Sequence, residues 1–179
     1  NQGLFGYVRG ASSTDRAEIS NVGVINSNIQ GYRNVGGIAG YAYYTTITNC
    51  YNTGEVTGIG YVGGVVGYNA SSTVSNSYNT GTVTGSDRNV GGVVGRNHSA
   101  TVSNSYNTGT VTGSGSYVGG IVGYNYASAT VSNSYNTGTV TGSGSYVGGI
   151  VGYNYASATV SNSYNTGTVT GSGSYVGGI

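Results

Sequence analysis

The chain has 179 residues, with 36 glycines, 19 tyrosines and no proline, methionine or tryptophan. Charges are few, because five arginines and four acidic residues give a net charge of +1, and no charged side chain follows Arg96. Nucleic acids and anionic lipids require clustered basic residues, and a membrane span requires a long apolar run, so we expect no nucleic-acid partner and no membrane insertion.

The first 18 residues precede the regular pattern. The letters GLFG at Gly3–Gly6 match the glycine-rich end of a repeat unit, so residues 1–18 are expected to be the end of a preceding unit or an irregular N-terminal segment. Because the chain begins at Asn1 and ends inside a repeat at Ile179, we expect it to be part of a longer protein.

A tandem repeat occupies the rest of the chain. The first apolar residue of each unit recurs every 27–29 residues, at Ile19, Ile47, Val74, Val102, Val131 and Val160. The residue before each pair of glycines keeps the same phase, at Val35, Val62, Val90, Val118, Val147 and Val176. A fixed period of this size is typical of solenoids, propellers and other arrays. We therefore predict a single repeat array over residues 1–179, without a linker or a second domain.

Each unit contains three extended runs, TVSNSYN, TVT and YVGGIVGYN, which are separated by the turn-forming sequences NTG and GSGS. The abundance of glycine, asparagine, threonine and β-branched residues disfavours helix. The repeat therefore predicts an all-β fold, a β-solenoid (β-helix) with about one coil of three short strands per 27–29-residue repeat.

Alternation along a strand assigns side chains to opposite faces. In TVT, Val111 is predicted to face the core, with its two threonine neighbours outside. In VSNSYN, the same rule places Val102, Asn104 and Tyr106 on one face, and both serines and the second asparagine on the other.

The glycine-rich run does not alternate in this way. The sequence leaves open which of Val118, Ile121 and Val122 faces the core. The paired glycines between them predict a bulge or a corner, because glycine adopts backbone conformations that are closed to other residues.

Stacked coils would place equal side chains on one another, for example Asn107 on Asn136 and Tyr106 on Tyr135. Asparagine and aromatic ladders favour such stacking, whereas an ionised residue would meet its own copy, which explains the scarcity of charge. A single unit buries too little apolar surface to offset its conformational entropy, so stability is expected to grow with the number of coils.

A short glycine core follows the same period. It reads GGIAG, GGVVG, GGVVG, GGIVG and GGIVG at Gly36–Gly40, Gly63–Gly67, Gly91–Gly95, Gly119–Gly123 and Gly148–Gly152. Together with TVSNSYNTG, this core resembles the GLUG motif of large bacterial surface and secreted proteins, which include some immunoglobulin A-cleaving metallopeptidases and adhesin-like proteins. The resemblance implies a β-solenoid on the cell exterior. It does not imply catalysis, because the zinc motif of those peptidases lies outside the repeats and nothing in this sequence matches it.

Reactive side chains are rare. His98 is the only histidine, and later units carry tyrosine in its position, so it is expected to be a tolerated surface aromatic residue. Cys50 is the only cysteine and occupies a position that holds serine in other units. A metal site or a nucleophilic triad needs several partnered groups, so we expect no catalytic residue, no cofactor and no metal.

Two repeated surfaces remain as candidates for binding. The first is a threonine array, at Thr82, Thr84, Thr110, Thr112, Thr139, Thr141, Thr168 and Thr170. It resembles the water-organising face of ice-binding solenoids, although threonine is also a favourable solvent-facing strand residue and Glu55 interrupts the array. The second consists of tyrosines beside the glycine core, at Tyr68, Tyr124, Tyr126, Tyr153 and Tyr155, with Tyr117, Tyr146 and Tyr175 before it. Tyrosines can stack on sugars or on a neighbouring fibre, or cover the ends of a thin core.

These observations favour a non-enzymatic structural and interaction segment of a bacterial surface or extracellular fibre, either an adhesin-like stalk or a subunit of a self-assembling filament. The alternative is a ligand-binding solenoid for glycan or ice, through the tyrosine or threonine ladders. A disordered segment that assembles through cross-β contacts is a third hypothesis, and an enzyme is the last. The expected partners are further copies of the chain, through its charge-free half, and a glycan.

Overall fold

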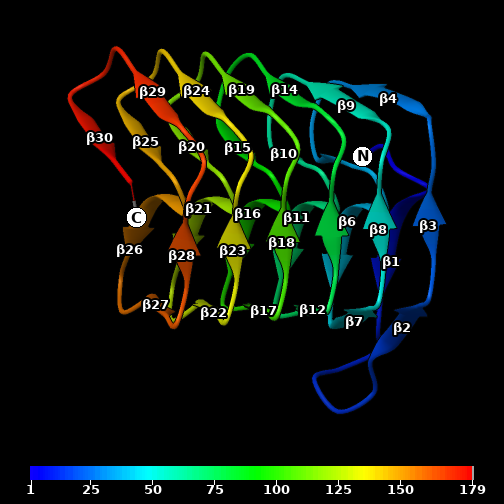
Figure 1. The fold of residues 1–179 in the computed structure, drawn as a ribbon. Helices are drawn as coiled ribbons and strands as arrows, with labels where there is room; N and C mark the ends of the chain where they lie inside the picture. The colour runs from blue at the N-terminus through cyan, green and yellow to red at the C-terminus, as the bar shows by residue number, and fades with distance from the viewer. Residues whose placement is uncertain (179) are drawn as a thin grey trace.

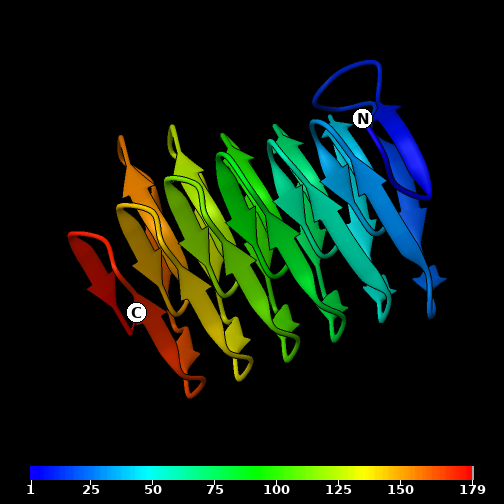
Figure 2. The same cartoon turned by 90° about the horizontal axis from the view of Figure 1, so that it is seen from above.

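The protein is described by a computed structural model of residues 1–178, and Ile179 in the last predicted repeat lies outside the described residues. Short strands are arranged in five parallel sheets of six strands each. One strand from each sheet forms one coil, and the coils stack from the N-terminal end to the C-terminal end (Figure 1; from above in Figure 2). The chain is a β-solenoid, as the repeat predicts. Within residues 1–178 there is no helix long and apolar enough to span a membrane.

The sheets are numbered in the order in which one coil passes through them. Sheet 1 consists of β1 (Phe5–Arg9), β6 (Ala39–Tyr43), β11 (Val66–Ala70), β16 (Val94–His98), β21 (Val122–Tyr126) and β26 (Val151–Tyr155). Sheet 2 consists of β2 (Ala17–Ser20), β7 (Thr45–Thr48), β12 (Thr73–Ser75), β17 (Thr101–Ser103), β22 (Thr130–Ser132) and β27 (Thr159–Ser161).

The other three sheets complete each coil. Sheet 3 consists of β3 (Gly23–Val24), β8 (Tyr51–Asn52), β13 (Tyr78–Asn79), β18 (Tyr106–Asn107), β23 (Tyr135–Asn136) and β28 (Tyr164–Asn165). Sheet 4 consists of β4 (Asn28–Gly31), β9 (Glu55–Gly58), β14 (Val83–Gly85), β19 (Val111–Gly113), β24 (Val140–Gly142) and β29 (Val169–Gly171). Sheet 5 consists of β5 (Val35–Gly36), β10 (Val62–Gly63), β15 (Asn89–Gly91), β20 (Tyr117–Gly119), β25 (Tyr146–Gly148) and β30 (Tyr175–Gly177).

The strand register shows that one repeat forms one coil. Val111 in β19 pairs with Val83 in the preceding coil and with Val140 in the following one. The first apolar residues of successive units pair in the same manner, from Ile19 to Val160. Equivalent residues therefore lie next to each other along the whole solenoid.

Corners divide the three predicted runs into five strands. TVSNSYN is split at Asn104, where φ is 48°, a left-handed conformation that asparagine tolerates better than most residues. YVGGIVGYN is split at its paired glycines, because β20 ends at Gly119 and β21 begins at Val122. Strand β19 begins at the valine of TVT, Val111, and Thr110 precedes it.

The predicted faces are correct for TVT and partly wrong for VSNSYN. Val111 is fully buried and its threonine neighbours are exposed. In VSNSYN, however, Val102 is buried while Asn104 and Tyr106 lie on the outside, and Ser105 is buried instead. The left-handed corner at Asn104 restarts the two-residue alternation, so side chains beyond it change faces.

The interior contains two apolar clusters, and it also contains polar side chains. Val118 belongs to one cluster and Ile121 and Val122 to the other, so all three residues that the sequence left open face the core. A column of buried asparagines includes Asn107 and Asn136, as the stacking argument predicts for this pair.

The paired glycines lie at a corner, as predicted, but the physical reason differs from the predicted one. No glycine in residues 1–178 has a positive φ, and the left-handed corners are formed by asparagine, serine, alanine and Tyr44. Glycine is required because neighbouring coils come very close. A Cβ atom on Gly123 would lie 2.7 Å from the carbonyl oxygen of Gly95 and 2.7 Å from the amide nitrogen of Val90. Close approach, and not backbone freedom, explains the glycine core.

The N-terminal residues join the first coil. β1 pairs with β6 in parallel, and the following loop leaves the coil before β2 (dark blue in Figure 1). Arg16 at the end of this loop donates to the Ser71 carbonyl oxygen through two nitrogens, at 3.1 and 2.9 Å. The loop is thereby attached to the coil that contains Ser71.

Candidate interaction surface

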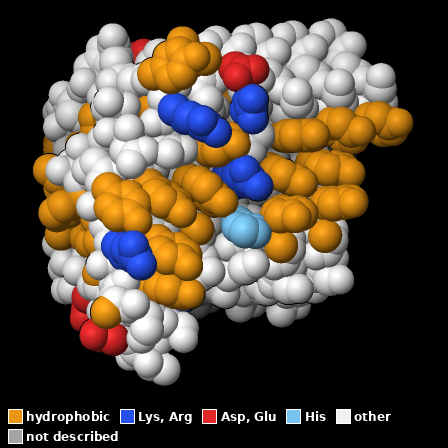
Figure 3. Space-filling model, turned by 180° about the vertical axis from the view of Figure 1, so that it is seen from behind, with side chains coloured by type: hydrophobic (Ala, Val, Ile, Leu, Met, Phe, Trp, Pro, Cys, Tyr) orange, Lys and Arg blue, Asp and Glu red, His pale blue; other side chains and the backbone are white. Residues whose placement is uncertain are grey.

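Sheets 1 and 5 carry most of the tyrosines on their outer sides. We call this surface the tyrosine face, and it consists of Tyr41, Tyr68, Tyr117, Tyr124, Tyr126, Tyr146, Tyr153, Tyr155 and Tyr175. Tyr61 packs edge-on against Tyr68 but is itself buried, at 5% exposure. In Figure 3, hydrophobic side chains form a broad area on this side of the molecule, with basic side chains among them. All eight tyrosines that the sequence analysis names beside the glycine core belong to this face.

The face is built by strand register. Tyr124 in β21 pairs with Tyr153 in β26, and their ring centroids are 5.5 Å apart. Tyr117 from sheet 5 lies beside both, at 5.0 Å from the Tyr124 ring and 5.1 Å from the Tyr153 ring. Tyr126 stacks on Tyr155 at 5.9 Å. These separations lie in the range of favourable aromatic pairs, so the rings support one another as a platform.

Arg96 replaces a tyrosine in this array. In the register of sheet 1 it lies between Tyr68 and Tyr124. Its guanidinium carbon is 5.0 Å from the Tyr68 ring centroid and 5.3 Å from the Tyr61 ring centroid, distances typical of cation–π contacts. Arg96 Nη1 also donates to Tyr61 Oη at 3.0 Å. Sequence reasoning missed this residue, although its place in the tyrosine column can be read from the repeat.

Two more arginines lie near Tyr61. The Arg33 guanidinium carbon is 5.5 Å from the Tyr61 ring centroid, and Arg88 lines a hollow together with Tyr61 and Arg96. Burial opposes ionisation of the Tyr61 phenol, but Arg33, Arg96 and Arg88 outweigh burial and lower its pKa. The site therefore has a positive potential in a chain that otherwise has little charge.

His98 occupies the position that Tyr126 holds in the next coil. Its ring lies 5.1 Å from the Tyr126 ring at 20°, and its Nδ1 is 3.2 Å from Tyr68 Oη. Burial, followed by the charge of Arg96, lowers the pKa of His98. The residue thus acts as a neutral aromatic member of the face.

The predicted threonine array lies on sheet 4. Thr84, Thr112, Thr141 and Thr170 form one column in parallel register. The second column consists of Thr82, Thr110, Thr139 and Thr168. These side chains are exposed, except that Thr84 is half-buried, and Glu55 takes the threonine position in β9.

A further tyrosine ladder lies on sheet 3. It consists of Tyr51, Tyr78, Tyr106, Tyr135 and Tyr164. Successive rings are 4.8–5.2 Å apart and nearly parallel, with interplanar angles of 3–6°. The stacking of Tyr106 on Tyr135 is the arrangement that the repeat predicts.

The model of the GLUG motif matches residues 31–57, 58–84, 86–112, 114–141 and 143–170. The chain belongs to the GLUG-motif family. A crystal structure of a candidate immunoglobulin A1 protease from Bacteroides ovatus is similar, with a TM-score of 0.76 and 26% sequence identity. The match covers 96% of this chain and 60% of that protein, so this chain spans less than two thirds of its length. Comparison with curated proteins gives no match.

The GLUG core forms the corner between sheet 5 and sheet 1. In the core Gly119–Gly123, Tyr117 precedes the corner and Tyr124 follows it, and their rings meet outside. Because the glycines of the core have no side chains, the backbone turns within a small space, and both tyrosines face the same side. The motif that defines the family thus also builds the tyrosine face.

Cys50 has a structural position in its GLUG unit. Its backbone nitrogen donates to Ser77 Oγ at 3.1 Å, and the backbone nitrogen of Ser77 donates to Ser105 Oγ at 3.3 Å. Burial raises the pKa of the Cys50 thiol, which makes it a poor nucleophile. Among the described residues, no three His, Cys, Asp or Glu side chains lie close enough to hold a metal ion.

Proposed function

We propose that this GLUG solenoid is a non-enzymatic structural and interaction segment of a bacterial surface or extracellular protein, where it acts as a stiff spacer. The observation that carries the proposal is the unbroken register of five sheets across the coils. Each coil is bonded to the next on every side, so bending between two coils would have to break strand pairing.

Side-chain ladders inside the solenoid add to this stiffness. Asn79, Asn107 and Asn136 are linked by amide hydrogen bonds of 2.8 Å from coil to coil. On the outside, the tyrosines of sheet 3 stack in parallel along the same axis. Buried polar groups fix one register, because a displaced coil would leave them without partners.

The similar Bacteroides ovatus protein supports a place within a larger chain. The solenoid corresponds to 60% of that protein, which leaves room there for other parts. We do not carry protease activity over to this chain, since its one histidine is held among tyrosines and its one cysteine is buried. In our proposal the solenoid holds other parts at a distance from the cell surface and offers its side faces for contact.

The spacer role can be tested by changing the number of coils. Residues 131–159 form one unit that can be removed or repeated without creating a new kind of junction. Its removal joins Thr130 to Val160, which recreates the natural junction of Thr130 with Val131. Adding four such units should lengthen the particle by about 19 Å, at about 4.8 Å per coil, as measured by small-angle X-ray scattering. A maximum dimension that does not grow in proportion to the number of units would refute a stiff spacer.

The exterior location needs a separate test. Antibodies against the folded solenoid should label intact cells of the source bacterium, and labelling that requires permeabilised cells would contradict the proposal. An antibody against a cytosolic protein serves as the control for cell integrity.

Ligand binding is the second candidate function, and the tyrosine face favours it. Broad aromatic platforms that are half exposed suit stacking with sugar rings, so glycan is the preferred ligand. For ice, the relevant surface is the exposed threonine array on sheet 4. Thermal hysteresis of the purified chain tests the ice alternative directly, and its absence would leave glycan as the ligand to examine.

A further inference from the structure

The first observation is that arginines gather on the tyrosine face. Arg33, Arg88 and Arg96 are three of the five basic residues of the chain, and all three line hollows around Tyr61. Asp87 is the one acidic residue there, and its carboxylate lies 3.4 Å from Arg88 Nε in a pair that is more than half exposed. The local balance of charge is therefore positive.

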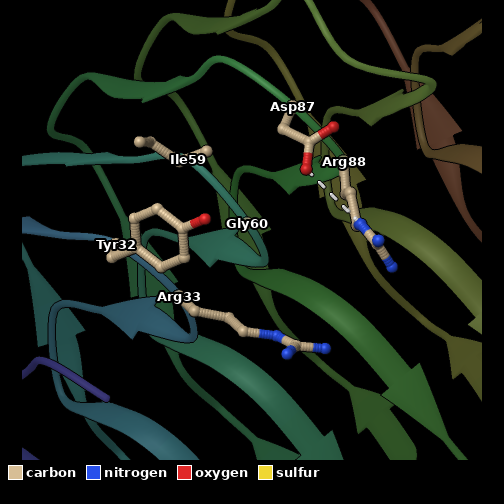
Figure 4. A pocket seen from close by; sticks show the side chains of 6 residues that line it. All are labelled: Tyr32, Arg33, Ile59, Gly60, Asp87 and Arg88. Atoms are coloured by element: carbon tan, nitrogen blue, oxygen red, sulfur yellow. Dashed lines mark ion pairs between the residues drawn. The ribbon is translucent and has the colours of Figure 1, made fainter.

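The repeat explains how these charges come together. Arg33 and Arg88 lie in equivalent turns of two coils that are separated by one coil. In the coil between them, Gly60 N donates to the Tyr32 carbonyl oxygen at 2.9 Å, and Asp87 N donates to the Ile59 carbonyl oxygen at 2.9 Å. Figure 4 shows both arginine side chains beside the space over Gly60, with Tyr32 across from them. A Cβ atom on Gly60 would lie 3.0 Å from Arg33 Cγ, so the absence of a side chain there leaves room for the Arg33 side chain.

Two larger hollows meet at Tyr61 and Arg96. One, of about 350 Å³, is lined by Arg88, Arg96 and Tyr117 among others. The other, of about 240 Å³, is lined by Arg33, Tyr68 and Arg96 among others. Each hollow thus combines guanidinium groups with tyrosine rings.

Arg96 has unused capacity to bind an anion. Its Nε is shielded from solvent and has no hydrogen-bond partner among residues 1–178. A buried donor without a partner is costly, and an anionic oxygen would satisfy it once the side chains that shield this nitrogen move aside. The planar guanidinium is suited to two parallel hydrogen bonds with a carboxylate or a sulfate.

We propose that the Arg33–Arg88–Arg96 hollows bind an acidic saccharide, whose carboxylate or sulfate is held by arginine while its sugar rings lie on the neighbouring tyrosines. The three arginines lie within four successive coils, so they match one or two negative charges and not a long polyanion. The platform continues without charge through Tyr124 and Tyr153, which suits uncharged rings of the same ligand. This proposal deepens the ligand-binding alternative and is independent of the spacer role.

The test uses the whole chain and calorimetric titration with four sugars: sialyllactose, a glucuronate-containing disaccharide, sulfated lactose and neutral lactose. Binding of at least one acidic sugar, about tenfold tighter than lactose, is the expected result. The carboxylate and sulfate arms identify the acidic group. A hexaglutamate peptide is the comparison for acidic protein, and binding of that peptide as tight as the best sugar would overturn the proposal.

Arg96→Tyr is the decisive variant, because Tyr68 and Tyr124 hold its place in the neighbouring coils and the fold should tolerate the change. Binding of the acidic sugar should weaken about tenfold. Arg16→Ser removes the same charge outside the hollows and should leave binding unchanged.

Circular dichroism and a thermal melt establish that Arg96→Tyr is folded. Should it fail to fold, exposed Arg88→Ser, which introduces the residue found at Ser116 in the next coil, replaces it with the same expected loss. Failure of all acidic sugars to bind, or equal binding by wild type and the folded variant, overturns the proposal. Neither result affects particle length, so the spacer role is judged separately.

Discussion

Asn107 Nδ2 donates to Asn136 Oδ1 at 2.8 Å inside the solenoid, and it also donates to the carbonyl oxygen of Gly109 at 2.7 Å. Asn79 makes the same two kinds of bond one coil earlier. Each amide is therefore both a link between coils and a support for the turn that follows it. Such a column stabilises the fold only when every buried amide has a bonded neighbour, and the repeat provides that neighbour in each coil.

The asparagine ladder should be most sensitive in the middle. Asn107→Ala removes the donor to Asn136 and leaves the Gly109 carbonyl unpaired, so we expect a loss of about 2–4 kcal/mol in the free energy of unfolding. Asn165→Ala makes the same change in the last described coil, where the residue is half-buried, and should cost about 1 kcal/mol. Urea unfolding measures both, and equal losses would show that burial of the ladder is unimportant.

The two faces of β19 should respond differently to charge. Val111 is fully buried between Val83 and Val140, so Val111→Asp places an unpaired carboxylate in the core and should cost about 4 kcal/mol or prevent folding. Thr112→Asp changes an exposed side chain and should alter stability by about 0.5 kcal/mol or less. Thermal melts compare the two, and similar midpoints would contradict the assigned faces.

The sequence was sufficient for the period, the strand class and the stacking. Val111 and Val140 hold the same position in successive units, so the repeat alone predicts their pairing, because parallel coils align equivalent residues. It was insufficient for the corners. The backbone conformation of Asn104 depends on how the coil closes, and that closure reverses the expected faces of Ser105 and Tyr106.

The candidate surface was only partly predictable. The tyrosine positions follow from the repeat, but the grouping of Arg33 with Arg88 and Arg96 depends on which sheets adjoin across the glycine corner. One signal was present in the sequence. Arg96 interrupts a column of tyrosines. A residue that departs from a strict repeat is a candidate for a specific function, because the scaffold itself needs only the repeated residue.

Glycine at one core position should matter only where another coil packs against it. Gly6 and Gly123 hold equivalent places, but a Cβ on Gly123 would meet Gly95 and Val90 at 2.7 Å, whereas on Gly6 its nearest neighbour would be Asn1 at 3.4 Å. Gly123→Ala should therefore cost more than about 3 kcal/mol or prevent folding. Gly6→Ala should be neutral or stabilise by up to about 1 kcal/mol. Chemical denaturation measures both variants, and a harmless Gly123→Ala would disprove the role of close packing.

The tyrosine ladder on sheet 3 should make stability fall in alkali. Burial, and then the neighbouring phenols of Tyr78 and Tyr135, raise the pKa of Tyr106. The folded state therefore holds this proton more tightly than the unfolded chain, so its contribution is complete below a pH of about 10 and is lost as the pH rises through the folded pKa. Melting temperatures between pH 9 and 11 should decline, and Tyr106→Phe should reduce the slope. Tyr32→Phe, at an exposed residue outside the ladders, is the control, and an equal effect of both variants would argue against the ladder.

The charge-free half of the chain should mediate self-association. Beyond Arg96 the surface consists of threonine, serine, asparagine and tyrosine, so two copies can approach without electrostatic repulsion. We expect the molecular mass measured by light scattering to rise with concentration. Introducing Thr110→Arg with Thr168→Arg adds charge at two exposed positions of one column that are separated by a coil, which avoids direct stacking of like charges, and should shift the protein toward monomer. Ser13→Arg with Gln30→Arg adds the same charge to the other half and should leave association unchanged. A wild-type chain that stays monomeric at high concentration would rule out this interface, and equal dissociation by both pairs would assign the effect to net charge instead of to this half of the solenoid.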